Sequence, residues 1–125
     1  MSSSAFPICD PRIAPDGCLP TGCLSVDWAL GGGIPLGRIT EVYGDEGSGK
    51  ATLMLQIARS AAERGTASLW LDATGTFPAA YARAVMGDMG GRLAVLGPAT
   101  GEAAFDVIGR ASGSAGLVLV PRLAP

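Results

Sequence analysis

The residues best suited to chemistry lie in one short glycine-rich segment. Lys50, the only lysine of the chain, ends a G-x-x-x-x-G-K pattern that begins at Gly44. This spacing is typical of a phosphate-binding loop, in which backbone N–H groups and the lysine ammonium surround the phosphates of a nucleotide. The residue after the lysine usually offers a hydroxyl to Mg²⁺, but here it is Ala51. The pattern therefore predicts phosphate binding and leaves metal binding open.

Two elements must position this loop. Residues 38–43 have the composition of a strand that leads into it, and residues 50–64 that of a helix with Leu53, Ile57 and Ala61 on one face. A helix that begins at Lys50 directs the positive end of its dipole toward an anion. This strand–loop–helix context favours a phosphate site, and a purely structural glycine-rich turn stays open as the alternative.

The remaining pattern alternates short apolar strands with helices. Strands are expected at 68–72, 92–96 and 116–120, and helices at 21–30, 78–86 and 100–112. Continuous apolar strands between helices predict an α/β fold with a parallel sheet and helices on both faces. Thr21 or Ser25 is the expected N-cap of the first helix, and Trp28 and Trp70 are expected in the core. Four prolines predict an irregular N-terminal arm over 1–20, with the core over 21–125.

Composition excludes several classes of function. The chain has 125 residues, of which 48% are hydrophobic and 16% charged, so we expect one globular domain. The absence of histidine excludes imidazole chemistry, and a net charge of −2 without a basic block offers no footprint for nucleic acid. Cys9, Cys18 and Cys23 form no C-x-x-C pair, which favours free thiols over zinc. With no long apolar run and no signal peptide, a soluble cytoplasmic protein is expected.

Together these residues resemble the ATPase core of the RecA recombinase family. The likeness runs through 21–31, 37–44, Gly49-Lys50, 71–73, 81–83 and 117–120, and covers about residues 20–121. It implies a RecA-like P-loop core, truncated after the Walker B strand, that binds ATP or ADP weakly. The implied nucleotide-binding residues are Gly44, Asp45, Glu46, Gly47, Ser48, Gly49, Lys50, Ala51, Thr52 and Tyr81.

Three positions that the family uses for hydrolysis differ in this chain. Besides Ala51, Thr74 stands where the family has a water-activating glutamate, and Pro121 where it has an aspartate that orders Mg²⁺. A fourth difference is Pro78, at the family's adenine-contacting aspartate. The resemblance therefore implies nucleotide binding without efficient hydrolysis, with no catalytic and no metal-binding residue. An ATPase that uses other residues and a decaying gene copy both stay open.

The resemblance also implies a setting in DNA recombination, DNA repair and the SOS response. A second hypothesis is an interaction module without nucleotide, similar to ImuA-like accessory proteins, that binds a full-length RecA recombinase or a translesion polymerase. The family's DNA-binding loops follow the last strand, and this chain ends at Pro125, so DNA binding is not implied. Residues 38–43 are expected to form a sheet edge open to another chain. Asp72 is expected either at the nucleotide site or in a structural role.

Overall fold

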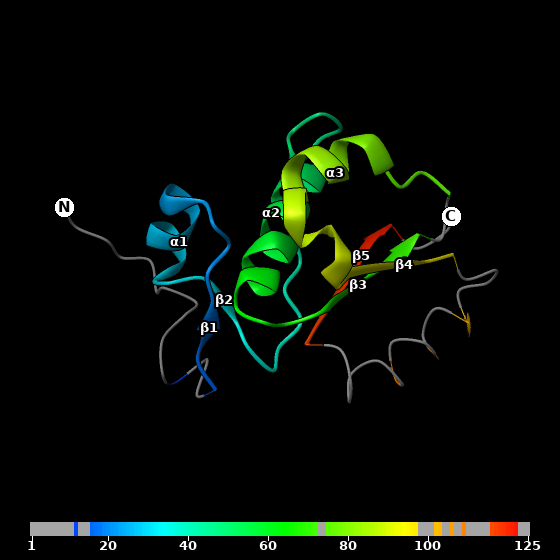
Figure 1. Cartoon of the computed structure of the whole chain (residues 1–125). Helices are drawn as coiled ribbons and strands as arrows, with labels where there is room; N and C mark the ends of the chain where they lie inside the picture. The colour runs from blue at the N-terminus through cyan, green and yellow to red at the C-terminus, as the bar shows by residue number, and fades with distance from the viewer. Residues whose placement is uncertain are drawn as a thin grey trace.

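The computed structural model describes residues 12, 16–72, 75–97, 102, 103, 106, 109 and 116–122. In chain order, its elements are β1 (Cys18–Leu19), α1 (Leu24–Leu30), β2 (Ile34–Pro35), α2 (Lys50–Glu63), β3 (Ser68–Asp72), α3 (Ala79–Met86), the 3-10 helix η1 (Gly87–Arg92), β4 (Leu93–Leu96) and β5 (Leu117–Arg122) (Figure 1). None of the helices in these residues has the length and apolar character needed to cross a membrane.

A parallel sheet of three strands forms the centre of the fold. Its order is β4-β3-β5, with β3 paired in parallel to both neighbours. Trp70 lies opposite Val95 on one side and Leu119 on the other. The α/β class and the parallel arrangement expected from alternating strands and helices are confirmed.

Helices α2 and α3 cover one face of this sheet (Figure 1). Trp70 is 1% exposed and packs with Leu55, Met86 and Leu119, while its ring meets Phe77 edge-on at 5.4 Å between centroids. Burying an indole and its aliphatic neighbours removes a large apolar area from water, which is the main stabilising contribution to such a core. This cluster holds the two helices in place relative to β3.

The opposite face of the sheet carries Leu69 and Leu71, which pack with Val118 and Val120. Successive strand residues point to opposite faces, so these side chains and Trp70 lie on different sides of β3. The helix expected over 100–112 falls mostly outside the described residues, and the four described positions within it are helical.

Helix α2 is apolar on two sides rather than on the single predicted stripe. Ile57 and Ala61 are buried against Leu19, with Leu53 beside them, as the i, i+4, i+8 spacing predicts. A second buried row of α2 faces the sheet and includes Leu55 and Ala58. The apolar surface of α2 is wider than the predicted stripe because the helix packs on both the β1–β2 ribbon and the main sheet.

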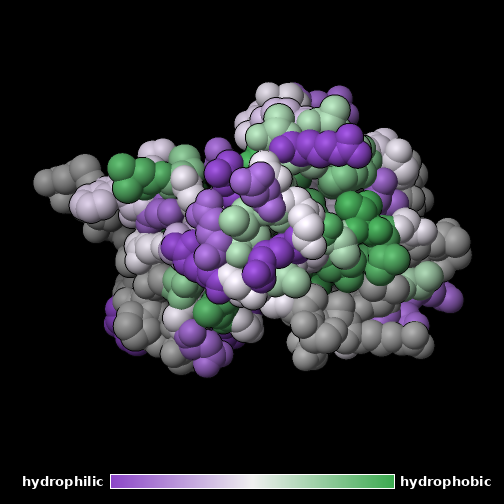
Figure 2. Space-filling model, viewed as in Figure 1, coloured by the Kyte–Doolittle hydropathy of each residue, from purple (hydrophilic) through white to green (hydrophobic). Residues whose placement is uncertain are grey.

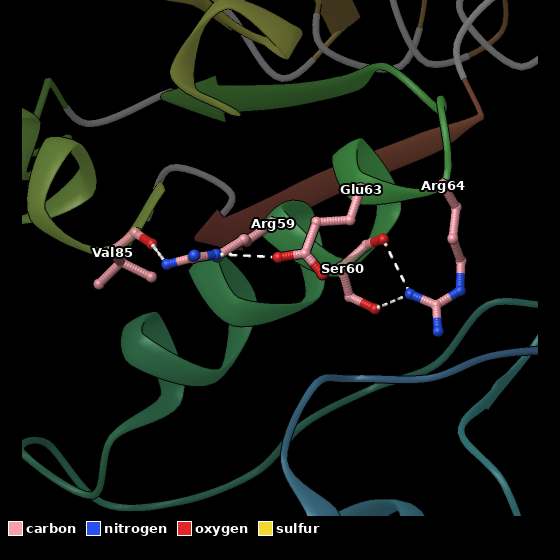
Figure 3. Close-up of polar contacts among 5 residues, drawn as sticks. All are labelled: Arg59, Ser60, Glu63, Arg64 and Val85. Carbon is pink, nitrogen blue, oxygen red and sulfur yellow. Dashed lines mark hydrogen bonds and ion pairs between the residues drawn. The ribbon is translucent and has the colours of Figure 1, made fainter. Parts of the chain in front are cut away.

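Polar contacts on α2 link it to α3 and stiffen its C-terminal turns (Figure 3). Arg59 donates to the Val85 carbonyl oxygen at 2.8 Å and to Glu63 Oε1 at 3.1 Å. Arg64 donates to the carbonyl oxygen and to the hydroxyl of Ser60 at 3.0 and 2.7 Å. A shallow hollow of about 390 Å³ adjoins these residues, and no residue of the 44–50 loop lines it.

The strand predicted over 38–43 does not form, and that prediction is wrong. These residues have no regular structure, and their apolar side chains are in water, with Ile39 100% exposed. Alternating β-prone residues become a strand only when a neighbouring strand supplies hydrogen bonds and packing. Within the described part of the chain, β5 pairs only with β3, so 38–43 makes no such ladder. In this sheet the strands at the two edges are β4 and β5, and 38–43 is not one of them.

The N-terminal arm is not irregular up to residue 20 as predicted. Cys18 and Leu19 form β1, which pairs antiparallel with β2, and Leu19 is buried. Its side chain packs on α2 next to Ile57, which is why this stretch is ordered despite the flanking prolines. Cys18 is disulfide-bonded, so the expectation of free thiols is wrong for this position.

Helix α1 differs from its prediction in both capping and burial. Neither Thr21 nor Ser25 caps the helix, because the N-cap position is Cys23 and no side chain caps it. Thr21 instead donates to Asp27 Oδ1, through its amide at 2.8 Å and its hydroxyl at 2.7 Å. No residue of α1 is buried, and Trp28, expected in the core, is 78% exposed. Figure 2 shows apolar surface over α1 and a larger apolar area over β4, where Val95 and Leu96 are exposed.

Candidate functional site

The glycine-rich loop connects the irregular segment 38–43 to the first turn of α2. Residues 44–49 are exposed, and α2 begins at Lys50, as the motif predicts. A backbone hydrogen bond from the Ser48 amide to the Asp45 carbonyl oxygen, 3.1 Å long, closes the loop into a turn. The side chains of Asp45 and Glu46 lie on the exposed outer part of this turn.

Two glycines are required by the geometry of this loop. Gly47 and Gly49 have φ of 79° and 93°, a left-handed conformation that residues with a Cβ rarely adopt. At Gly44 a Cβ would meet the Ser48 hydroxyl, which is the end of a short side chain. Gly47 and Gly49 therefore allow the backbone to turn into the start of α2.

Lys50 places its ammonium back over the loop. Its Nζ donates to the carbonyl oxygens of Gly44 and Asp45, the second at 3.1 Å. An ammonium has three N–H donors, so these two bonds leave one for an anion within the described part of the chain. The positive charge is therefore held against the loop backbone.

The first turn of α2 supplies further donors. The first backbone bond that closes onto this turn runs from the Leu53 amide to the Gly49 carbonyl oxygen at 2.9 Å. The amides of Lys50, Ala51 and Thr52 precede that bond, and the first N–H groups of a helix have no partner within the helix. Together with the helix dipole they form an anion-binding end next to the ammonium. The residues present therefore fit a phosphate group.

The hydroxyl that could serve a metal is engaged elsewhere. Ala51 carries only an exposed methyl group, and the next hydroxyl along the helix belongs to Thr52. Thr52 Oγ1 lies 2.9 Å from Tyr81 Oη, which joins the first turn of α2 to α3. Tyr81 is 44% exposed, so its ring keeps an open face beside the loop. The structure thus brings the loop helix and Tyr81 together, although they are 29 positions apart in the chain.

Asp72 has a structural role, one of the two alternatives left open for it. Its Oδ1 accepts the Thr76 amide at 2.9 Å, and its Oδ2 accepts the Phe77 amide at 3.2 Å. Both carboxylate oxygens therefore hold the segment that leads into α3. No sequence motif distinguishes this use of an aspartate from a ligand-binding one.

At the end of β5, Pro121 occupies an irregular position. The register between β3 and β5 runs from Trp70 opposite Leu119 to Asp72 opposite Arg122, so β5 has one more residue than β3 in this stretch. Proline is tolerated at such a bulge because it has no amide hydrogen to donate to the ladder. Its exposed ring offers no oxygen to a metal-bound water. The other substituted hydrolysis position, Thr74, lies outside the described residues.

The side chains at the start of α2 fit Mg²⁺ poorly. In nucleotide sites Mg²⁺ keeps several waters and is held by one or two protein oxygens together with the substrate phosphates. Ala51 offers no oxygen, and the hydroxyl of Thr52 is bonded to Tyr81. These two positions therefore offer a metal no uncommitted hydroxyl, whereas the amides and the ammonium suit phosphate.

The pKa of the Cys23 thiol is lowered from its ordinary value. The hydroxyl of Ser25, 3.5 Å from Cys23 Sγ, and the Val26 amide both stabilise the thiolate and lower its pKa. The shift arises at the start of α1, and none of the loop residues contributes to it. We therefore assign it to local hydrogen bonding rather than to the candidate site.

Comparison with known proteins supplies independent information. A family model described as the RecA N-terminal domain matches residues 9–124. Proteins named "Protein RecA" are similar to most of the chain. The one from Clostridium acetobutylicum is 46% identical over 90 residues, 71% of this chain and 26% of the relative.

Two other relatives extend the match. "Protein RecA" of Nitratidesulfovibrio vulgaris strain DP4 is 43% identical over 103 residues, 82% of this chain and 29% of the relative. That of Sulfurovum sp. strain NBC37-1 is 42% identical over 118 residues, 92% of this chain and 34% of the relative. The chain thus spans between a quarter and about a third of the length of these curated relatives.

Proposed function

The chain belongs to the RecA family, and from this premise we propose that it binds ATP or ADP through the 44–52 loop without efficient hydrolysis. The observation that supports the proposal is the start of α2, where the Lys50 ammonium lies over the loop carbonyl oxygens and the first amides have no partner within the helix. Tyr81, beside that turn, is the proposed contact for the base. The proposed setting is DNA recombination and repair.

The proposed binding is independent of Mg²⁺. Ala51 has no hydroxyl, that of Thr52 is bonded to Tyr81, and both Asp72 oxygens accept backbone amides. When bound, a metal ion would supply charge neutralisation for phosphoryl transfer, and these residues offer it no ligand set. Lys50 and the amides hold the phosphates in their ground state, which binds nucleotide without accelerating its cleavage.

Calorimetric titration with ATP and ADP, in Mg²⁺ and in EDTA, tests this proposal. We expect weak binding of similar strength in both buffers. Lys50→Ala is expected to weaken binding at least 10-fold, because a charge-assisted contact to phosphate is lost. Arg92→Ala, which removes one positive charge from η1, is the matched control and is expected to leave the affinity within about twofold.

Two outcomes would contradict the proposal. Absence of binding at millimolar nucleotide would show that the loop is not a nucleotide site. Mg²⁺-dependent turnover above the level of Lys50→Ala would show that hydrolysis is retained. Release of phosphate is therefore measured in the same samples.

A second candidate function is an interaction module that uses no nucleotide. It is favoured by β5, whose outer edge has no strand partner among the described residues, and by the exposed apolar side chains of β4 and α1. The proposed partners are a full-length RecA recombinase or a translesion polymerase. Pull-down of each purified partner by the immobilised chain tests this function, and failure to retain either would count against it.

A further inference from the structure

The contact between Thr52 and Tyr81 connects the candidate phosphate loop to a second helix. Thr52 is the third residue of α2, and Tyr81 is the third residue of α3. Their hydroxyl oxygens lie 2.9 Å apart. Thr52 follows Lys50 by two residues, a rise of about 3 Å along the axis of α2 and a rotation of about 200° around it. Tyr81 therefore contacts the same first turn of α2 that begins at Lys50. A nucleotide bound as proposed has its phosphates at Lys50 and its base at Tyr81.

The tyrosine is held at both ends of its side chain. On α3, the next residue, Ala82, and Met86 are buried in the core against α2, which places the backbone. At the other end, the hydroxyl is bonded to Thr52. As a whole, Tyr81 stays 44% exposed. An exposed tyrosine without the distal bond would exchange between rotamers and would have to be immobilised on binding.

From this geometry we infer that Thr52 is a positioning residue, which fixes the Tyr81 ring for stacking by the base of a nucleotide whose phosphates occupy the loop. Its side-chain hydroxyl serves base recognition, while the phosphates are held by Lys50 and the backbone amides. The inference rests on the proposed function and adds to it the residue that sets preference for a nucleotide over a bare polyphosphate. Preordering one side chain corresponds to about a 3- to 10-fold gain in affinity.

The test compares ATP with inorganic tripolyphosphate by calorimetry in EDTA. The two ligands share the phosphate chain and differ in the nucleoside, so the ratio of their affinities reports base recognition. Thr52→Val preserves the shape of the side chain and removes the hydroxyl. We expect it to lower the ATP to tripolyphosphate ratio by about 3- to 10-fold.

Variants on both sides of the contact complete the test. Tyr81→Phe keeps the ring and is expected to lower the ratio as much as Thr52→Val does, and the double variant is expected to add nothing further. Thr52→Ser keeps a hydroxyl at this position, and its ATP to tripolyphosphate ratio is expected to stay within about twofold of that of the unmodified chain. Circular dichroism of each variant checks that the fold is retained.

The outcomes separate this inference from the function on which it rests. An unchanged ratio in Thr52→Val, or an equal loss of both ligands, would overturn the positioning role while leaving the phosphate site in place. Failure of the unmodified chain to bind tripolyphosphate or ATP would overturn the proposed function and the inference with it.

Discussion

At the scale of single residues, the candidate site keeps its charge and lacks its metal ligands. Lys50 and two constrained glycines form the phosphate end of the loop. Ala51 and Pro121 offer no polar side-chain atom where one would be needed for Mg²⁺. The hydroxyl of Thr52 is turned to Tyr81. Ground-state binding and catalysis depend on different residues, and the proposed function assigns only binding to the residues that the structure describes.

Trp70 gives a prediction on stability at this scale. We expect Trp70→Ala to lower the free energy of unfolding by about 3–5 kcal/mol, because it leaves a cavity between the sheet and two helices. Trp70→Phe is expected to lower it by less than about 2 kcal/mol. The buried indole N–H has no hydrogen-bond partner among the described residues, so its removal loses no bond.

Urea denaturation followed by circular dichroism measures both changes. Trp28, which is exposed, supplies the matched control, and Trp28→Phe is expected to stay within about 0.5 kcal/mol of the unmodified chain. A loss in Trp70→Phe equal to that in Trp70→Ala would mean that the indole nitrogen makes a contact that stabilises the fold.

At the scale of elements, the segment before the loop is the main departure from expectation. Residues 38–43 carry β-prone side chains and lie outside the sheet, while β5 has one strand neighbour in the described region. The backbone N–H and C=O groups of a strand bond to those of a neighbouring strand, so a β-prone composition alone does not give either segment its hydrogen bonds. The phosphate loop is therefore anchored firmly on its helical side by α2, and only loosely on the other side.

Hydrogen exchange tests this difference between elements. Amides of 38–43 are expected to exchange at close to unfolded rates, and those of β3 at least 10-fold more slowly, because β3 lies between two strands. Mass spectrometry of peptic peptides provides the measurement. Equal protection of the two segments would show that 38–43 joins the sheet in solution.

At the scale of the whole molecule, ligand binding and stability are linked. A nucleotide that binds the folded chain alone stabilises it by about 1.4 kcal/mol at ten times its Kd. For a domain of this size, we expect a rise in Tm of about 5 °C. The rise is expected to be the same in EDTA as in Mg²⁺, since Ala51 offers no hydroxyl to a metal and that of Thr52 is bonded to Tyr81.

Differential scanning calorimetry measures this effect, and Lys50→Ala, with affinity at least 10-fold weaker, is expected to show a rise of no more than about 1.5 °C. A shift that appears only with Mg²⁺ would contradict metal-independent binding. A shift that persists in Lys50→Ala would place the nucleotide away from the loop.

Local patterns were sufficient for most of the elements. The helix that starts at Lys50, the apolar strand β3 and the parallel order of strands all follow from periodicity and spacing over a few residues. Such patterns work because a helix or a buried strand is specified by neighbours close in the chain. The glycine–lysine spacing placed the loop at the start of α2 for the same reason.

Contacts between distant segments were decided by the folded chain alone. Whether 38–43 becomes a strand depends on a partner strand, and whether Trp28 is buried depends on what packs against α1. The Thr52–Tyr81 bond and the use of Asp72 as a backbone acceptor likewise follow from the packing of α2 and α3 on the sheet. The types and spacing of the residues indicate a possible phosphate site. The packing of α2 and α3 determines which groups the side chains of Thr52, Tyr81 and Asp72 bond.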